Sequence, residues 1–128
     1  MAVDLNMNIL IVDDIEAMLR VLRNLLKQLN FRNIDQAANG SEALAKLRAG
    51  DFGLVISDWQ MEPMTGIDLV REMRADKKLK HLPFVMVTAE TQRDRLAVAK
   101  QAGVDTTIIK PLTTDSLRKT LVGVLGNF

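Results

Sequence analysis

Residues that can do chemistry stand at the ends of several short, mostly apolar runs in this sequence. Runs 9–12, 54–57, 84–87 and 106–109 are each followed at once by a polar side chain, namely Asp13 with Asp14, Asp58, Thr88 and Lys110. Such runs are typical of strands buried on both faces of a parallel sheet. Ligands bind at the edge that the carboxyl ends of such strands form. We therefore expect three carboxylates, a hydroxyl and an amine to meet at one edge of a sheet.

Three carboxylates in one small site repel one another, and one of them would tend to hold a proton. A hard divalent cation removes this difficulty. Mg²⁺ takes oxygen ligands and favours sites that combine one or two carboxylates with a phosphate. The chain has no cysteine, and no histidine stands among these residues, so zinc is not indicated. We predict Mg²⁺ as the cofactor, with Asp13, Asp14 and Asp58 as its ligands.

A carboxylate can also act as a nucleophile, and its attack on a phosphoryl group gives an aspartyl phosphate. The barrier to phosphoryl transfer falls mainly through positioning and charge neutralisation. Mg²⁺ and the Lys110 amine would neutralise charge, and the Thr88 hydroxyl would donate a hydrogen bond to a phosphoryl oxygen. The residue types therefore fit a phosphoaspartate site.

Each of these residues has a structural interpretation when it is taken alone. Asp14 would cap a helix, Thr88 would reflect the β propensity of threonine, and Lys110 would be a surface lysine. The set as a whole ends consecutive strands on one edge of one sheet. Chance is a poor explanation for that arrangement, so the chemical interpretation is favoured.

The elements that must position these residues alternate along the chain. We expect strands at 8–12, 34–37, 54–58, 83–88 and 106–109. We expect helices at 15–29, at 42–49, after Thr65, between Thr91 and Gly103, and from Thr113 or Thr114 through Leu125. This pattern predicts an α/β fold, a doubly wound five-stranded parallel sheet of the flavodoxin-like (βα)₅ kind with helices on both faces.

Four of the predicted helices have a capping signal at their start, and for the second helix it lies within Asn39-Gly40-Ser41. Asp14 is placed to cap the first helix with its carboxylate. Thr65, with Asp68 three residues later, forms a variant of the capping box. Thr91 and Asp94 repeat that spacing before the fourth helix.

Length and composition limit the possible classes of protein. The chain has 128 residues, the size of one domain, and we expect a single domain at 1–128 with no output domain. The net charge of +1 gives no reason to expect nucleic-acid binding through a broad basic face. No apolar run approaches the roughly 18 residues of a membrane span, and no signal peptide is evident. The expected protein is soluble, cytoplasmic and bound to no membrane.

Four segments carry a resemblance to a known family. They are Ile11-Val12-Asp13-Asp14, Ile56-Ser57-Asp58-Trp59-Gln60-Met61, Val87-Thr88-Ala89-Glu90 and Ile109-Lys110-Pro111. In type, order and spacing they resemble the receiver domain of two-component response regulators. The resemblance covers essentially the whole chain and is closest to the single-domain regulators of chemotaxis.

The resemblance implies a role for each matching residue. Asp58 would be the phosphoacceptor. Asp13 and Asp14 would be the acidic pair that holds Mg²⁺, one of them acting through water. The backbone carbonyl of Gln60 would be a further metal ligand.

The remaining matching residues would contact or sense the phosphoryl group. Lys110 would contact the phosphate and precede a cis peptide to Pro111, and Thr88 would be the switch hydroxyl that moves toward the phosphoryl group. Two positions depart from the family pattern. Thr107 stands where receivers often carry an aromatic ring that turns inward, so a ring movement is not the readout here. Gln60 replaces a shorter amide beside the acyl phosphate and bears on the phosphoryl lifetime.

The implied function is that of a signalling protein, not of an enzyme with turnover. A partner histidine kinase would phosphorylate Asp58 in a Mg²⁺-dependent step, and autodephosphorylation would be a route by which the acyl phosphate is lost. Phosphorylation would then shift the face formed by the fourth helix, the fifth strand and the fifth helix, where Glu90 and Thr107 are candidate interaction residues. That face would bind a downstream target protein, either a flagellar motor switch or a phosphotransfer protein, and the regulator would be a monomer.

Two alternatives remain open. A phosphorelay shuttle would pass the phosphoryl group on to a phosphotransfer protein and drive no motor. An interaction-only domain would bind partners without being phosphorylated. The complete set of five polar residues argues against the second alternative, and nothing in the sequence separates the first from a chemotaxis regulator.

Overall fold

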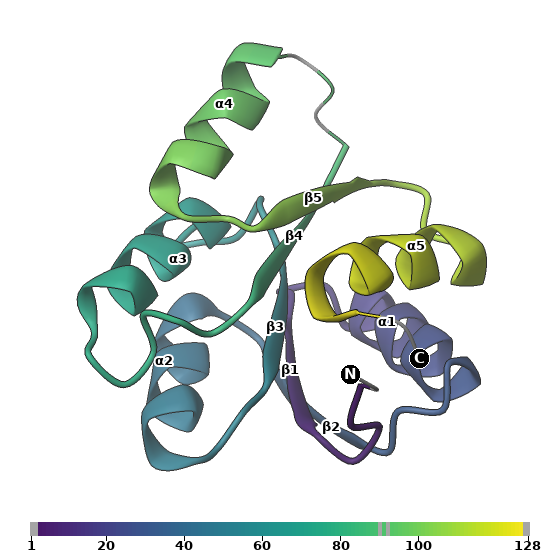
Figure 1. The fold of residues 1–128 in the computed structure, drawn as a ribbon. Helices are drawn as coiled ribbons and strands as arrows, with labels where there is room; N and C mark the ends of the chain where they lie inside the picture. The colour runs from purple at the N-terminus through teal and green to yellow at the C-terminus, as the bar shows by residue number, and fades with distance from the viewer. Residues whose placement is uncertain (1–2, 90, 92, 127–128) are drawn as a thin grey trace.

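The computed structural model describes residues 3–89, 91 and 93–126, in which strands and helices alternate (Figure 1). The strands are β1 (Asn8–Val12), β2 (Asn33–Ala37), β3 (Leu54–Asp58), β4 (Phe84–Thr88) and β5 (Thr106–Ile109). The helices are α1 (Glu16–Gln28), α2 (Gly40–Ala49), α3 (Gly66–Ala75), α4 (Arg93–Ala102) and α5 (Thr114–Leu125). The predicted alternation of five strands and five helices is confirmed.

The five strands form one parallel sheet in the order β2-β1-β3-β4-β5. Helices α1 and α5 lie on one side of the sheet, and α2, α3 and α4 lie on the other (Figure 1). The chain begins at β1, places β2 on one side of it, and then places β3, β4 and β5 in succession on the other side, so the strand order reverses direction at β1. This doubly wound architecture is the predicted one, and it places all five carboxyl ends of the strands at one edge.

Alternating side chains of the central strands fill two separate cores. In β1, Ile9 and Ile11 pack with Leu22 of α1, whereas Leu10 and Val12 belong to the core on the other side. All four of these β1 side chains have no measurable exposure. Burial on both faces explains why the strands appear in the sequence as continuous apolar runs.

Side chains cap three of the helices at their starts. Asn39 accepts a hydrogen bond from the Glu42 backbone at 2.9 Å, so α2 begins two residues earlier than predicted. The capping box of Thr65 and Asp68 at α3 is confirmed. Thr113 forms a second capping box, with Ser116, at α5.

Within the described residues, no helix is both long and apolar enough to cross a membrane.

The predicted capping role of Asp14 is wrong. The residue before α1 is Ile15, whose side chain has no polar atom to cap with. The backbone N–H of Ile15 instead donates to Oδ1 of Asp13 at 2.9 Å. The predicted cap of α4 at Thr91 adjoins residue 92, which is outside the described residues.

Candidate functional site

The parallel register brings three polar strand ends together. Asp13 directly follows β1, while Asp58 ends β3 and Thr88 ends β4. The three residues are 1%, 2% and 4% exposed, and together with Ser57 they are the buried polar residues of the described chain. Polar groups are rarely buried without a partner or a function, so this edge of the sheet is the first candidate for a site.

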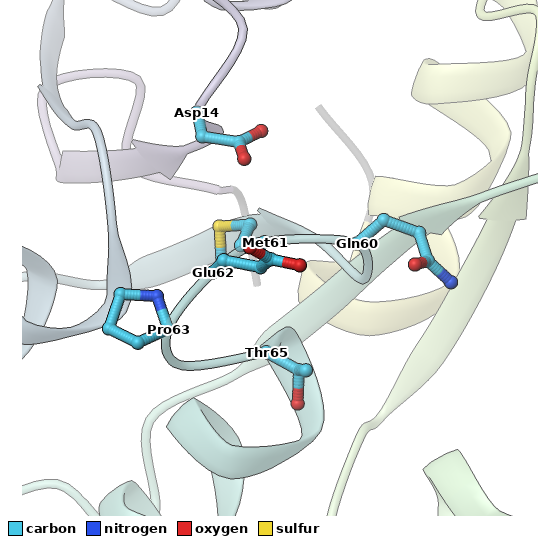
Figure 2. A pocket seen from close by; sticks show the side chains of 6 residues that line it. All are labelled: Asp14, Gln60, Met61, Glu62, Pro63 and Thr65. Carbon is cyan, nitrogen blue, oxygen red and sulfur yellow. The ribbon is translucent and has the colours of Figure 1, made fainter.

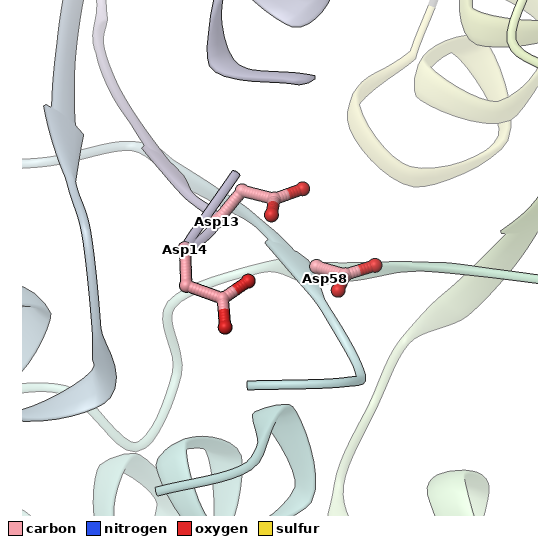
Figure 3. A group of neighbouring side chains, drawn as sticks. All are labelled: Asp13, Asp14 and Asp58. Carbon is pink, nitrogen blue, oxygen red and sulfur yellow. The ribbon is translucent and has the colours of Figure 1, made fainter. Parts of the chain in front are cut away.

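The three aspartates predicted to bind a metal do lie together (Figure 3). One carboxylate oxygen each from Asp13, Asp14 and Asp58 lies within 4.8 Å of the other two. Asp13 and Asp58 are buried, whereas Asp14 is exposed, so the cluster opens to solvent on the Asp14 side. The structure therefore joins the two loops that follow β1 and β3 into one acidic cluster.

Lys110 supplies a positive charge to this cluster. Its Nζ lies 2.9 Å from Oδ1 of Asp58, which makes an ion pair. The backbone N–H of Lys110 donates to the Thr88 carbonyl at 2.9 Å, so the end of β5 is tied to the end of β4. The Lys110–Pro111 peptide is cis, as expected.

Two buried carboxylate oxygens in the cluster lack a hydrogen-bond partner among the described residues. They are Oδ2 of Asp13 and Oδ1 of Asp58. The Lys110 ammonium is near the second oxygen, but their relative orientation is not that of a hydrogen bond. Leaving a buried carboxylate oxygen without a hydrogen bond is costly, which indicates that both oxygens are available to bind a ligand.

The electrostatics of the cluster agree with this interpretation. Burial raises the pKa of Asp13 from 3.8 to about 6. The Ile15 N–H and the Lys110 ammonium act in the opposite direction, while the Asp58 and Asp14 carboxylates add to the increase. Burial together with crowding by like charges is the condition that a bound cation relieves.

The residues present fit a magnesium ion. The cluster supplies carboxylate oxygens only, two of them buried and without a hydrogen bond, and Mg²⁺ prefers oxygen ligands and keeps several waters. The open side at Asp14 leaves room for such waters and for a phosphate. Within the described residues, no histidine or cysteine joins the acidic cluster.

A pocket of about 780 Å³ adjoins the cluster (Figure 2). Its lining residues are Asp14, Gln60, Met61, Glu62, Pro63 and Thr65. Gln60 therefore lines the pocket beside the acidic cluster, and the predicted role of its carbonyl as a metal ligand stays a prediction. Glu62 was missed as a lining residue, and its only sequence signal is its place in the turn that follows Asp58.

The predicted switch and interaction residues are placed unevenly. Thr88 is buried at the end of β4, and Thr107 is half-buried in β5, paired in register with Met86. Pro111 is exposed beside Lys110. Glu90 lies outside the described residues. Sequence reasoning also missed a contact between Trp59 and Arg95, two residues that nothing in their spacing connects.

Known proteins resemble this chain over most of its length. The model of the response regulator receiver domain family matches residues 9–122. The chemotaxis protein CheY-3 of Vibrio cholerae serotype O1 is 49% identical over 116 residues, which make up 91% of this chain and 89% of that protein.

Solved structures agree with the sequence relatives. The chemotaxis protein CheY4 of Vibrio cholerae superposes with a TM-score of 0.87 at 32% identity, covering 94% of this chain and 99% of that one. The receiver domain of the Pseudomonas aeruginosa sensor histidine kinase PA1611, solved with a magnesium ion coordinated in its active-site cleft, gives a TM-score of 0.85 at 25% identity and covers 95% and 99% of the two chains. The chain therefore belongs to the response regulator receiver domain family and is closely related to the CheY regulators of chemotaxis.

Proposed function

We propose that this protein is a single-domain response regulator in which Asp58 accepts a phosphoryl group from a phosphohistidine of a partner kinase. The observation that carries the proposal is the state of the Asp58 carboxylate. It is buried, its Oδ1 has no hydrogen-bond partner, and it lies 2.9 Å from the Lys110 ammonium within an acidic cluster. A carboxylate that is held in place by an ion pair but has an oxygen without a hydrogen bond is suited to nucleophilic attack.

Each residue of the cluster has a separate role in the transfer of the phosphoryl group. A carboxylate oxygen of Asp58 attacks phosphorus, and the bond from phosphorus to the donor imidazole nitrogen breaks with its electron pair left on that nitrogen. Lys110 balances the charge on the phosphoryl oxygens, and Thr88 donates a hydrogen bond to one of them. Asp13, Asp14, Asp58 and the Gln60 carbonyl would hold Mg²⁺, which supplies neutralisation of the phosphoryl charge when it is bound. The magnesium ion described for the PA1611 receiver domain supports this assignment.

Phosphorylation would act as a switch on protein binding. It adds a charge of roughly −1.5 to −2 at the end of β3, which draws Lys110 and Thr88 inward. The surface formed by α4, β5 and α5 then shifts between two arrangements and binds a downstream target such as a flagellar motor switch. Thr107 lies in this surface without an aromatic ring, so a ring movement is not its readout. We place this activity in the cytoplasm and assign the protein no turnover as an enzyme.

The fluorescence of Trp59, the only tryptophan, tests the proposal. We expect Mg²⁺ to change the emission, and acetyl phosphate or beryllofluoride to change it again. Asp58→Asn should remove the second change because it removes the nucleophile and the anchor for the mimic. A folded wild-type protein that responds to neither addition would contradict the proposal.

A further inference from the structure

Trp59 directly follows the proposed phosphoacceptor and contacts a cation from another element. The guanidinium carbon of Arg95, in α4, lies 5.1 Å from the centre of the Trp59 ring. At this distance the guanidinium is attracted to the negative face of the indole. The tryptophan is only 6% exposed, so the ring is a fixed part of the protein interior. Helix α4 thus contacts the residue beside Asp58 through a directional interaction.

The backbone of Trp59 is held on both sides. Its N–H donates to the Val87 carbonyl of β4 at 3.1 Å, and its carbonyl accepts from the Gly66 N–H at the start of α3 at 3.0 Å. The loop is also tightly packed, because a Cβ atom on Gly66 would lie 2.5 Å from the Asp58 carbonyl oxygen. The indole is therefore held in place beside Asp58, and Arg95 contacts it from α4, a separate element.

Helix α4 is otherwise weakly attached over its length. Of residues 93–102, Ala99 alone is buried, whereas each of the other helices buries two or more residues. Ala99 lies toward the C-terminal end of the helix. The first turn and a half of α4 therefore has few apolar contacts that oppose its movement.

The C-terminal end of α4 is fixed by one side chain from α3. Arg74 donates from Nε and Nη2 to the Gly103 carbonyl, at 3.0 and 2.8 Å, and from Nη1 to the Leu82 carbonyl at 2.6 Å. Gly103 has φ +110°, and a Cβ atom there would lie 2.7 Å from Cγ of Arg74. One end of α4 is anchored, and the other contacts the site through Arg95.

We propose that Arg95 is a positioning residue that couples α4 to the state of Asp58 through its stacking on Trp59. This inference rests on the proposed function. A phosphoryl group on Asp58 adds negative charge beside the indole, which attracts the guanidinium and favours the stacked arrangement. Helix α4 then turns about its anchored end near Gly103 as the stack tightens. By linkage, loss of the stack weakens binding of a phosphoryl mimic by the factor by which the mimic strengthens the stack.

Calorimetric titration with beryllofluoride at saturating Mg²⁺ measures this coupling. We expect Arg95→Gln to weaken beryllofluoride binding by about fivefold, the lower end of typical coupling between sites. Arg93→Gln is the matched control, because it removes the same charge from the same exposed end of α4 but from a different side of the helix, and its effect should stay within about twofold. Arg95→Lys keeps the charge without the planar group and should recover part of the affinity.

Two further measurements isolate the stack itself. Acrylamide quenching of Trp59 in Mg²⁺-free protein should increase in Arg95→Gln and stay unchanged in Arg93→Gln, because Arg95 lies over the ring and Arg93 is on a different side of the helix. In a Trp59→Leu background, shown to be folded by circular dichroism, Arg95→Gln should change beryllofluoride affinity by less than about twofold.

The outcomes separate this inference from the proposed function. If Arg95→Gln and Arg93→Gln bind beryllofluoride equally well, the coupling is overturned even when quenching differs, because the stack then only packs. The proposed function would stand in that case, since the wild type still responds. If the wild type binds no beryllofluoride and takes no phosphoryl group from acetyl phosphate, both the proposed function and the coupling fail.

Discussion

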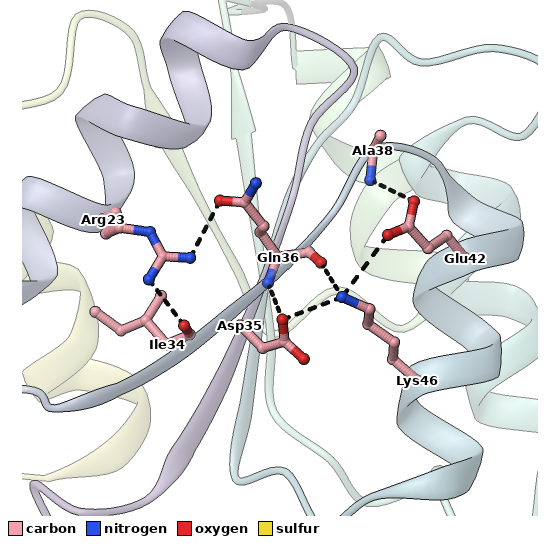
Figure 4. A network of polar contacts seen from close by, with 7 residues as sticks. All are labelled: Arg23, Ile34, Asp35, Gln36, Ala38, Glu42 and Lys46. Carbon is pink, nitrogen blue, oxygen red and sulfur yellow. Dashed lines mark hydrogen bonds and ion pairs between the residues drawn. The ribbon is translucent and has the colours of Figure 1, made fainter.

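The polar residues along β2 and those at the ends of β1 and β3 differ in how completely their charges are paired. The β2 network consists of Arg23, Ile34, Asp35, Gln36, Ala38, Glu42 and Lys46 (Figure 4). Lys46 lies 3.1 Å from Asp35 and donates to the Gln36 carbonyl at 2.6 Å. Arg23 donates to the Ile34 carbonyl at 2.9 Å and to the Gln36 side chain at 3.1 Å. In the acidic cluster, by contrast, two buried oxygens have no hydrogen-bond partner.

The two regions shift the acidity of an aspartate in opposite directions. Slight burial raises the pKa of Asp35, but the hydrogen bonds from Lys46 and from the Gln36 N–H outweigh it, so the pKa is lowered. Burial raises the pKa of Asp13 to about 6 against the weaker effect of the Ile15 N–H. The Asp35 carboxylate in the β2 network therefore has a structural role, whereas the carboxylates of the acidic cluster are available to bind a ligand.

The largest expected effect comes from removing the charge that faces Asp58. Lys110→Met should slow phosphorylation of Asp58 by acetyl phosphate by about 100-fold, because a preorganised positive group aimed at the phosphoryl oxygens is lost. The rate is measured from Trp59 fluorescence at saturating Mg²⁺. Lys46→Met is the matched control from the β2 network, and its rate should stay within about twofold of wild type. Equal phosphorylation rates for the two variants would show that Lys110 in the acidic cluster matters no more to the reaction than Lys46 in the β2 network.

Neutralising Asp13 should stabilise the protein. The folded-state pKa is raised from 3.8 to about 6, so the ionised carboxylate is disfavoured in the folded state at neutral pH. Asp13→Asn should therefore raise the free energy of unfolding in Mg²⁺-free buffer near pH 7.5 by about 2 kcal/mol. The free energy of unfolding is measured by urea denaturation, with circular dichroism as the signal. A loss of stability would show that the Asp13 charge is already compensated.

Acid should weaken magnesium binding. Protonated Asp13 cannot act as a ligand, and its raised pKa places protonation near pH 6. The apparent Kd for Mg²⁺ from Trp59 fluorescence should rise as the pH falls below that value, by about tenfold per pH unit. In Mg²⁺-free protein the same titration has the opposite effect on stability, because the penalty for ionised Asp13 disappears as the pH falls from about 6 toward 4. A pH-independent Kd between pH 7 and 5 would contradict the assignment.

The smallest effect is expected in the β2 network. Asp35→Asn removes the ion pair with Lys46, whose partners are 52% and 34% exposed, so solvent screens the loss. The free energy of unfolding at neutral pH should fall by about 0.5 kcal/mol. Because the pKa of Asp35 is lowered, this contribution is present above its unfolded-state pKa and is lost as the pH falls through the folded-state pKa. A gain in stability, as expected for Asp13→Asn, would remove the contrast between the regions.

The sequence predicted the elements well and their ends less well. The order of strands and helices and the capping box at Thr65 follow from apolar periodicity and short-range spacing, and both are confirmed. Asp14 was wrongly predicted to cap α1. Ile15 precedes the helix, no side chain caps it, and the Ile15 N–H donates to Asp13, an arrangement that depends on the turn of the backbone after β1. The contact of Arg95 with Trp59 left no signal, since it joins a loop to a helix that is distant in sequence.

The sequence by itself determined that Asp13, Asp14, Asp58, Thr88 and Lys110 share one edge. Alternation of strands and helices forces a parallel sheet, and a parallel sheet brings the carboxyl ends of its strands together. Only the tertiary structure decided which buried carboxylate oxygens lack a hydrogen bond, that Lys110 lies 2.9 Å from Asp58, and that Arg95 stacks on Trp59. The physical reason is that burial, ion pairing and stacking depend on distances of a few ångströms between separate segments, which periodicity along one segment does not encode.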